Sequence, residues 1–245
     1  MKAILDIIFI AIILACAWTG YKKRLIMGIG GILAIIISIY GANLLSNTFS
    51  AEIVPAMRPF VSGYMDTKFT ESIYDTLGYE PDENGEYDVE YSIPDLLDKN
   101  PGIVRIACIN SFKAMGVAYS SAEIMADEAI AYTSGHTEYL KDSVSETFCS
   151  RFAYIAGFLL AFALIIIVLT VVGNLPNLSF AIPYIGIADN IAGAVIGLVR
   201  GIALCLVLGY ALKFTGLILP QDTIADTWLA CKFVNSGLIT NYLGL

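Results

Sequence analysis

The chain has 245 residues, of which 57% are hydrophobic and only 15% are charged. Soluble domains carry about 25% charged residues, so this composition excludes an ordinary water-soluble globule. The charge is unevenly spread: Ser46 to Ser150 hold 18 acidic and 6 basic residues, a net charge of −12, and the rest hold 4 acidic and 8 basic residues. We therefore expect an apolar membrane protein with an acidic insert. An acidic insert argues against nucleic acid as a partner, because phosphate backbones require Lys and Arg.

Four apolar runs approach the roughly 20 residues that a helix needs to cross about 30 Å of hydrocarbon. They are Ala3–Thr19, Leu25–Leu45, Phe152–Val172 and Ile191–Leu212. The predicted fold is all-α: a polytopic membrane protein with four transmembrane helices and an extracytoplasmic helical insert between spans 2 and 3. The first run could instead be a signal peptide. Its basic cluster follows the apolar residues rather than preceding them, which favours an uncleaved helical hairpin.

The orientation is inferred from Lys22, Lys23 and Arg24, three adjacent cations in a short turn that should stay in the cytoplasm. This places the N-terminus, the insert and the tail outside and the connection 174–190 inside. We expect four regions: a first transmembrane hairpin at 1–45, the insert at 46–150, a second hairpin at 151–213 and an amphipathic tail at 214–245.

The insert divides into three parts. Residues 50–77 predict an amphipathic extension of the second span, because their apolar side chains recur at roughly helical spacing: Ile53, Phe60, Tyr64, Phe69, Ile73 and Leu77. Residues 78–100 hold eight acids and one lysine and are expected to form a solvated linker. They lack the ligand ladder of an EF-hand, so weak calcium binding is the less favoured alternative. Residues 101–150 predict two or three short helices.

The inner connection and the tail are both expected at the membrane interface. Residues 174–190 are apolar but interrupted by Pro176, Pro183 and Gly186, and should lie along or dip into the inner interface. In the tail, one predicted face gathers Ile224, Trp228, Cys231, Val234 and Leu238. We expect an interfacial helix there, with Trp228 as its headgroup anchor.

A stripe of small residues marks the fourth run, with successive members four residues apart: Gly193, Gly197, Gly201, Cys205 and Gly209. At 3.6 residues per turn they form one groove against which another helix can pack closely. The second run carries a matching seam of Gly31, Ala34, Ser38 and Gly41. We expect both to be helix-packing surfaces.

Arg200 lies beside this groove, near the middle of its span. A charge at that depth costs from about 2.5 to over 10 kcal/mol, so its candidate partners are Asp6, backbone carbonyls or a water-filled cavity. Either Arg200 fixes helix register, or it lines a pathway for an anion. Asp6 with Arg151 is the easier ion pair, and Asp189 should cap the N-terminus of its own helix.

These residues resemble the colicin V production protein (CvpA) family of small bacterial inner-membrane proteins, commonly assigned four spans. The resemblance covers about the first 45 residues and Phe152 to about Ile239. The shared positions are Asp6, the basic turn, Asp189, Gly193, Gly197, Arg200-Gly201 and Trp228. The chain departs from the family at Lys23-Arg24, where an Arg–Gly pair is common, and at Asn190, where Arg is common. The resemblance implies a link to colicin V production or export and to envelope homeostasis.

No residue set predicts a reaction. His136 has no neighbouring ligand for a metal site or a catalytic dyad, and the five cysteines form no CxxC, although a Cys108–Cys149 bridge stays open. We therefore expect no enzyme and no cofactor. The leading hypothesis is a scaffold in the bacterial cytoplasmic membrane, associating with itself or with envelope membrane proteins. The alternative is a channel or transporter subunit with Arg200 lining a path.

Overall fold

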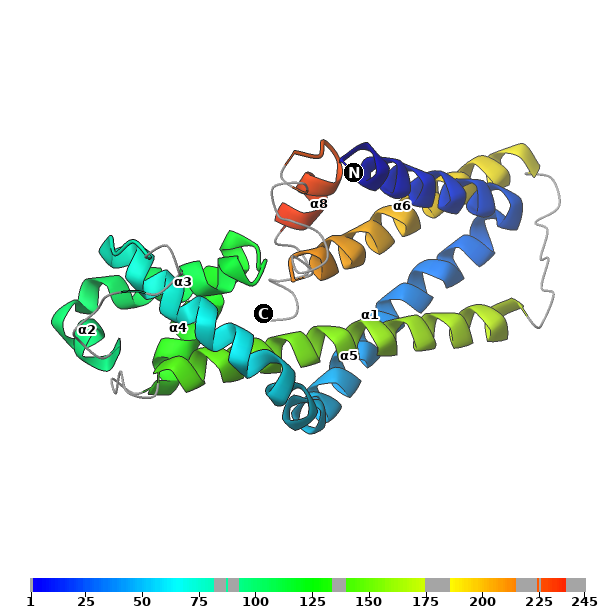
Figure 1. The fold of residues 1–245 in the computed structure, drawn as a ribbon. Helices are drawn as coiled ribbons and strands as arrows, with labels where there is room; N and C mark the ends of the chain where they lie inside the picture. Colours follow the sequence, from blue (N-terminus) through cyan, green and yellow to red (C-terminus); the bar gives the residue numbers. More distant parts are fainter. Residues whose placement is uncertain are drawn as a thin grey trace. The chain divides into compact units, whose positions relative to one another are not determined.

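A computed structural model describes residues 2–81, 87, 93–133, 140–174, 186–214, 224 and 226–236. All regular structure within these ranges is helical, which confirms the all-α prediction (Figure 1). The elements are α1 (Lys2–Leu77), α2 (Ile93–Lys99), the 3₁₀ turn η1 (Pro101–Ile103), α3 (Val104–Ala114), α4 (Tyr119–Thr133), α5 (Leu140–Asn174), α6 (Gly186–Leu212) and α8 (Ala230–Asn235).

Four helical segments are long and apolar enough to cross a membrane, as the sequence predicted. They are Ala3–Lys23, Met27–Pro59, Leu140–Gly173 and Ala188–Leu212. Each is longer than the apolar run that identified it. The fourth helix begins at Gly186, so the last part of the expected interfacial connection is helical. Residues 175–185 of that connection lie outside the described residues.

The chain forms two compact units. The membrane unit comprises Met1–Thr48, Ile155–Lys213 and Asp222–Leu245, and the second unit comprises Phe49–Tyr154 and Phe214–Gln221. Helices α1 and α5 each contribute to both units. The candidate site described below belongs to the membrane unit.

Within the membrane unit, α1 reverses direction between Gly20 and Gly28. Before this point α1 runs antiparallel to α6, since Phe9 contacts Cys205 and Gly20 approaches Gly193. After this point α1 runs parallel to α6, since Gly28 lies against Ile196 and Gly31 against Arg200. We call residues 3–23 the first limb and residues 27–48 the second limb. The dark-blue and lighter-blue parts of α1 meet at this turn (Figure 1).

Large apolar side chains cover the outside of the membrane unit. Among those more than half exposed are Ile7, Leu14, Leu33, Leu164 and Ile191. Exposing such a surface to water is unfavourable, whereas exposing it to the hydrocarbon of a bilayer is not. These faces are therefore the ones that contact lipid.

The second unit has a conventional apolar core. Met65, Phe69, Ile73, Phe112 and Met125 are at most 2% exposed. The expected amphipathic arm is present as the end of α1, but its buried face differs in detail, because Met65 is buried where Tyr64 was expected, and Tyr64 is 49% exposed. Helix α3 ends at Ala114, and Gly116, whose φ is 82°, lets the Val117 N–H donate to the Phe112 carbonyl at 3.0 Å.

Parts of the insert and tail differ from expectation. Residues 93–99 form α2, with Leu97 buried, where we expected linker; residues 82–86 and 88–92 lie outside the described residues. Cys108 and Cys149 are both free thiols. In the tail, Ala230–Asn235 form α8, and Ile224 is also helical.

Candidate functional site

The groove of small residues on α6 is filled by the first limb of α1. A β-carbon added at Gly201 would lie 2.9 Å from the Cα of Ile13, and one at Gly197 would collide with the carbonyl oxygen of Cys16. Gly20 meets the Gly193–Gly197 stretch in the same way, so glycines on both helices bring the backbones together. The groove is thus occupied within the chain along this length.

The same stripe continues through Cys205 to the tail. The buried Cys205 thiol contacts the Phe9 carbonyl oxygen at 3.7 Å. One turn further, a β-carbon at Gly209 would lie 2.8 Å from the backbone of Phe233 in α8. The rings of Phe9 and Phe233 stack with centroids 5.5 Å apart. All five members of the stripe therefore contact the chain itself.

The seam on the second limb has mixed neighbours. Gly31 faces the Arg200 side chain, and Gly41 faces Ile165 of α5. Ser38 is fully buried, and its hydroxyl donates to the Ala34 carbonyl at 2.7 Å, which satisfies it within its own helix. The second limb therefore packs against both α5 and α6.

Asp6 holds the start of the tail helix. Its carboxylate accepts backbone N–H bonds from Trp228 at 3.0 Å, Leu229 at 3.0 Å and Ala230 at 3.1 Å. These N–H groups lie at the beginning of α8, where a helix leaves its first donors without intrahelical partners. The N-terminal region and α8 lie beside each other (Figure 1). Asp6 thus joins the two ends of the membrane unit.

The pairing that we expected for Asp6 is not the one observed. Arg151, in the second unit, forms an ion pair with Glu128. One carboxylate oxygen of Glu128 lies 2.9 Å from Nε of Arg151 and 2.8 Å from one of its terminal nitrogens. The sequence carried no signal for the Asp6 contact, because its partners are backbone groups.

Asp189 forms a hydrogen bond to the turn at which α1 reverses direction. Its side chain is 5% exposed, and it accepts the backbone N–H of Leu25 at 3.1 Å. We expected Asp189 to cap its own helix; the described contact instead reaches across to the turn between the limbs. A buried carboxylate supplies an acceptor there, which matters because an unpaired N–H in hydrocarbon costs several kcal/mol.

The basic turn separates into different environments. Lys22 is exposed, with its ammonium 5.2 Å from the centroid of the Trp18 ring. Lys23 is half-buried and lines a cavity. The side chain of Arg24 lies outside what the structure describes.

That cavity, of about 140 Å³, lies beside Arg200 within the membrane unit. Its walls come from three helical segments: Lys23, Met27, Gly30, Gly31 and Ala34 of α1, Leu169, Thr170 and Gly173 of α5, and Arg200 of α6. The Nε atom of Arg200 is buried and has no hydrogen-bond partner among the described residues. Of the partners considered for Arg200, the structure therefore favours a cavity.

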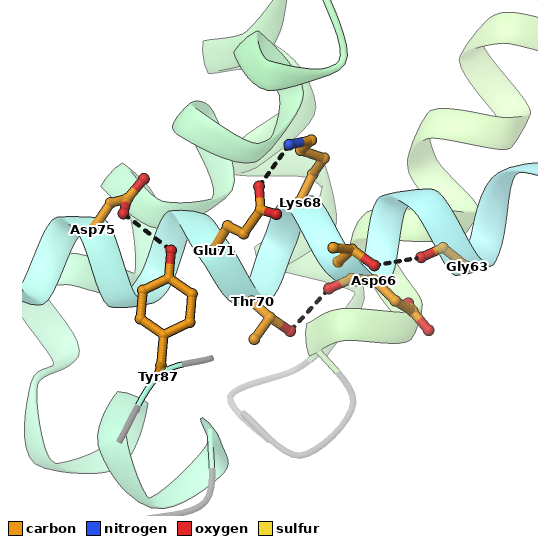
Figure 2. Close-up of polar contacts among 8 residues, drawn as sticks. Gly63, Asp66, Lys68, Thr70, Glu71, Asp75 and Tyr87 are labelled. Carbon is orange, nitrogen blue, oxygen red and sulfur yellow. Dashed lines mark hydrogen bonds and ion pairs between the residues drawn. The ribbon is translucent and has the colours of Figure 1, made fainter. Parts of the chain in front are cut away.

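The acidic second unit contains several polar pairs among its described residues. Lys68 bonds to Glu71 at 2.6 Å, and the Tyr87 hydroxyl donates to Asp75 at 3.4 Å (Figure 2). Partial burial together with the Asp75 charge raises the pKa of Tyr87. A cavity of about 510 Å³ there contains the Arg58–Glu146 pair at 2.6 Å. Of these contacts, the Arg58–Glu146 pair joins α1 to α5 within the unit.

The apolar face expected for the tail is only partly present. Trp228 is 70% exposed and lies 4.7 Å from the Lys232 ammonium, whereas Ile224 and Val234 are buried. Trp228 therefore does not share their face. Leu238 and His136 lie outside the described residues, and within the described ones no group of three His, Cys, Asp or Glu could hold a metal.

Four spanning helices, a lipid-facing apolar surface and internally paired polar groups define a multi-pass helical membrane protein. Residues 117–237 match the family model described as colicin V production protein. The chain is a member of the colicin V production protein family. The match begins at Val117, so it includes α4 and the start of α5 within the expected insert. No curated protein and no solved structure matches the chain.

Proposed function

We propose that this chain is a non-enzymatic accessory protein of the bacterial cytoplasmic membrane that binds and positions other envelope proteins. In this role it contributes to toxin (bacteriocin) production or export and to envelope homeostasis. The observation that carries the proposal is the family match over residues 117–237.

The packing of the membrane unit supports a scaffold. Its glycine groove is filled by the first limb, and its tail is held by Asp6. A close-packing surface that is already occupied is not available to a partner helix. The partner-binding surface therefore lies on another face, and the membrane unit serves as a fixed platform.

We assign partner binding to the second unit. Helices α3 and α4 lie outside the candidate spanning segments, so lipid contact does not explain why they expose large side chains. These side chains are Ile106, Tyr119, Ile124 and Tyr132. Tyrosine is enriched at protein–protein interfaces because it combines a large contact area with a hydrogen-bonding group.

The proposed orientation places the basic turn in the cytoplasm and the second unit outside. Cys108 and Cys149 are fully buried, and burial raises the pKa of the Cys108 thiol to about 12, so neither native thiol reports topology. Tyr132→Cys, at a position 69% exposed, should react with a membrane-impermeant maleimide on intact cells above the background of the unmodified chain. Reaction only after permeabilisation would reverse the orientation.

Photo-crosslinking tests the scaffold directly. A benzoylphenylalanine placed at Tyr119 or Tyr132 of the full chain in native membranes should yield discrete protein adducts. The matched control is Leu160, which is 64% exposed on a spanning segment and should yield lipid adducts. An adduct of twice the chain mass would identify a second copy as the partner. Absence of protein adducts from both tyrosine positions would contradict the proposal.

A channel or transporter subunit is the second candidate, favoured specifically by the cavity beside Arg200. It predicts solute or ion flux in liposomes containing the purified chain. Arg200→Gln should abolish that flux or reverse its ion selectivity. Liposomes without flux would eliminate this candidate while leaving the scaffold intact.

A further inference from the structure

The cavity beside Arg200 is electropositive. Among the described residues that line it, Lys23 and Arg200 are cations and none is a carboxylate. Asp6 accepts backbone N–H groups of the tail, and Asp189 accepts the backbone N–H of Leu25. The cavity therefore concentrates positive charge inside an apolar unit, where charge is screened weakly.

The guanidinium of Arg200 is held but incompletely satisfied. Its Cδ, Cζ and one terminal nitrogen lie against Gly31, at 2.9 to 3.3 Å from where a β-carbon would stand. The glycine thus makes room for the side chain. Its Nε is buried without a partner. A buried donor without an acceptor is destabilising unless another group pairs with it.

We propose that this cavity binds one phosphate-class oxyanion, with Arg200 as the main contact and Lys23 as the second cation. A planar guanidinium suits two oxygens of a phosphate, and a lysine adds a point charge. About 15 Å³ of such space admits one water. The 140 Å³ present therefore admits a single tetrahedral group and excludes a nucleotide.

The position of the cavity fits two sources of the same chemistry. Helical side chains lean toward the N-terminus of their helix, so Arg200 reaches toward the end of α6 that contains Asp189. Asp189 contacts Leu25, next to the basic turn. Phosphate is available at that end of a span both from lipid headgroups and from solution. Oxyanion binding does not depend on which proteins the chain assembles with.

The test uses the purified full-length chain stripped of lipid in a neutral detergent, with thermal unfolding as the readout. In one arm inorganic phosphate is titrated, and in the other phosphatidylglycerol is compared with a phosphate-free galactolipid. A ligand at 100 times its Kd shifts the unfolding equilibrium about 100-fold. A saturable shift in the first arm identifies a free anion, and one in the second arm only identifies a lipid headgroup.

Variants establish where the anion binds. Arg200→Gln should abolish the shift, and Lys23→Gln should raise the apparent Kd at least tenfold. Lys22→Gln is the matched control: it removes the same charge one residue away, from an exposed side chain that does not line the cavity, and should leave the Kd unchanged. If Arg200→Gln does not fold, the Lys23 and Lys22 variants decide. No shift in either arm, or equal effects of the two lysine variants, would overturn the proposal.

Discussion

The two units of this chain are stabilised in different ways. The membrane unit brings backbones together through glycines, and the carboxylates of Asp6 and Asp189 accept backbone N–H groups. The second unit buries whole aromatic and thioether side chains, and ion pairs such as Arg105–Asp127 lie at its surface. The difference follows from the solvent. Hydrocarbon is as apolar as leucine and gives apolar side chains no reason to associate, so close packing and backbone hydrogen bonds must suffice.

The largest expected effect is in the core of the second unit. Phe112 is fully buried, so Phe112→Ala removes its hydrophobic contribution and leaves a cavity, at a cost of roughly 3–5 kcal/mol. Tyr132→Ala, at a side chain 69% exposed, is the control and should change stability by less than about 0.5 kcal/mol. Thermal unfolding of the purified chain measures both. Equal effects would mean that this unit is not organised around an apolar core.

The membrane unit should show the opposite sensitivity, to enlargement rather than truncation. Gly197→Leu places four carbons where even a β-carbon would collide with the Cys16 carbonyl, which should cost roughly 3 kcal/mol by overpacking. The neighbouring Leu198 is 43% exposed, so Leu198→Ala should be far milder. Protease resistance in detergent compares the two. If both variants resist digestion equally, the contact between the first limb and α6 does not hold the unit together.

A third variant removes the carboxylate that joins the termini. Asp6→Ala leaves the N–H groups of Trp228, Leu229 and Ala230 without their acceptor, at a cost of about 2 kcal/mol. Hydrogen exchange at these amides should accelerate about 30-fold, while exchange in the second unit stays unchanged. Unchanged exchange at residues 228–230 would show that the tail is held by Phe233 and its neighbours instead.

The sequence predicted those features that depend on composition and periodicity. The four spans, the all-α fold and the small-residue stripe follow from apolar runs and a four-residue repeat. Side-chain-to-backbone contacts were not predictable in this way. Asp6 and Asp189 accept N–H groups that every residue has, so no complementary residue type marks the partner in the sequence. The Asp6–Arg151 pairing was wrong for this reason: matching opposite charges ignored backbone donors.

The buried face of the amphipathic arm shows a second limit. Periodicity placed Tyr64 among the apolar residues of that face, but Met65 is the buried one. A change of one residue corresponds to about 100° around a helix. It is decided by how neighbouring helices pack, which a single helical pattern does not contain. Pro55 and Pro59 lie within the first part of this arm and interrupt the hydrogen bonds of α1, so the helical phase of the residues before them does not carry over to Tyr64 and Met65.

The smallest expected effect concerns the surface charges of the second unit. Arg105 bonds to Asp127 at 2.6 Å, and this hydrogen bond lowers the pKa of the Asp127 carboxyl below its ordinary value of 3.8. A lowered folded-state pKa contributes stability that is present above pH 3.8 and is lost as the pH falls through the folded-state value. Both side chains are about half exposed, so solvent screening keeps the contribution small. Asp127→Asn should therefore lower the melting temperature slightly at pH 7 and not at all at strongly acid pH, and high salt should erase the difference. A large, salt-independent loss would mean that the second unit, like the membrane unit, depends on individual polar contacts.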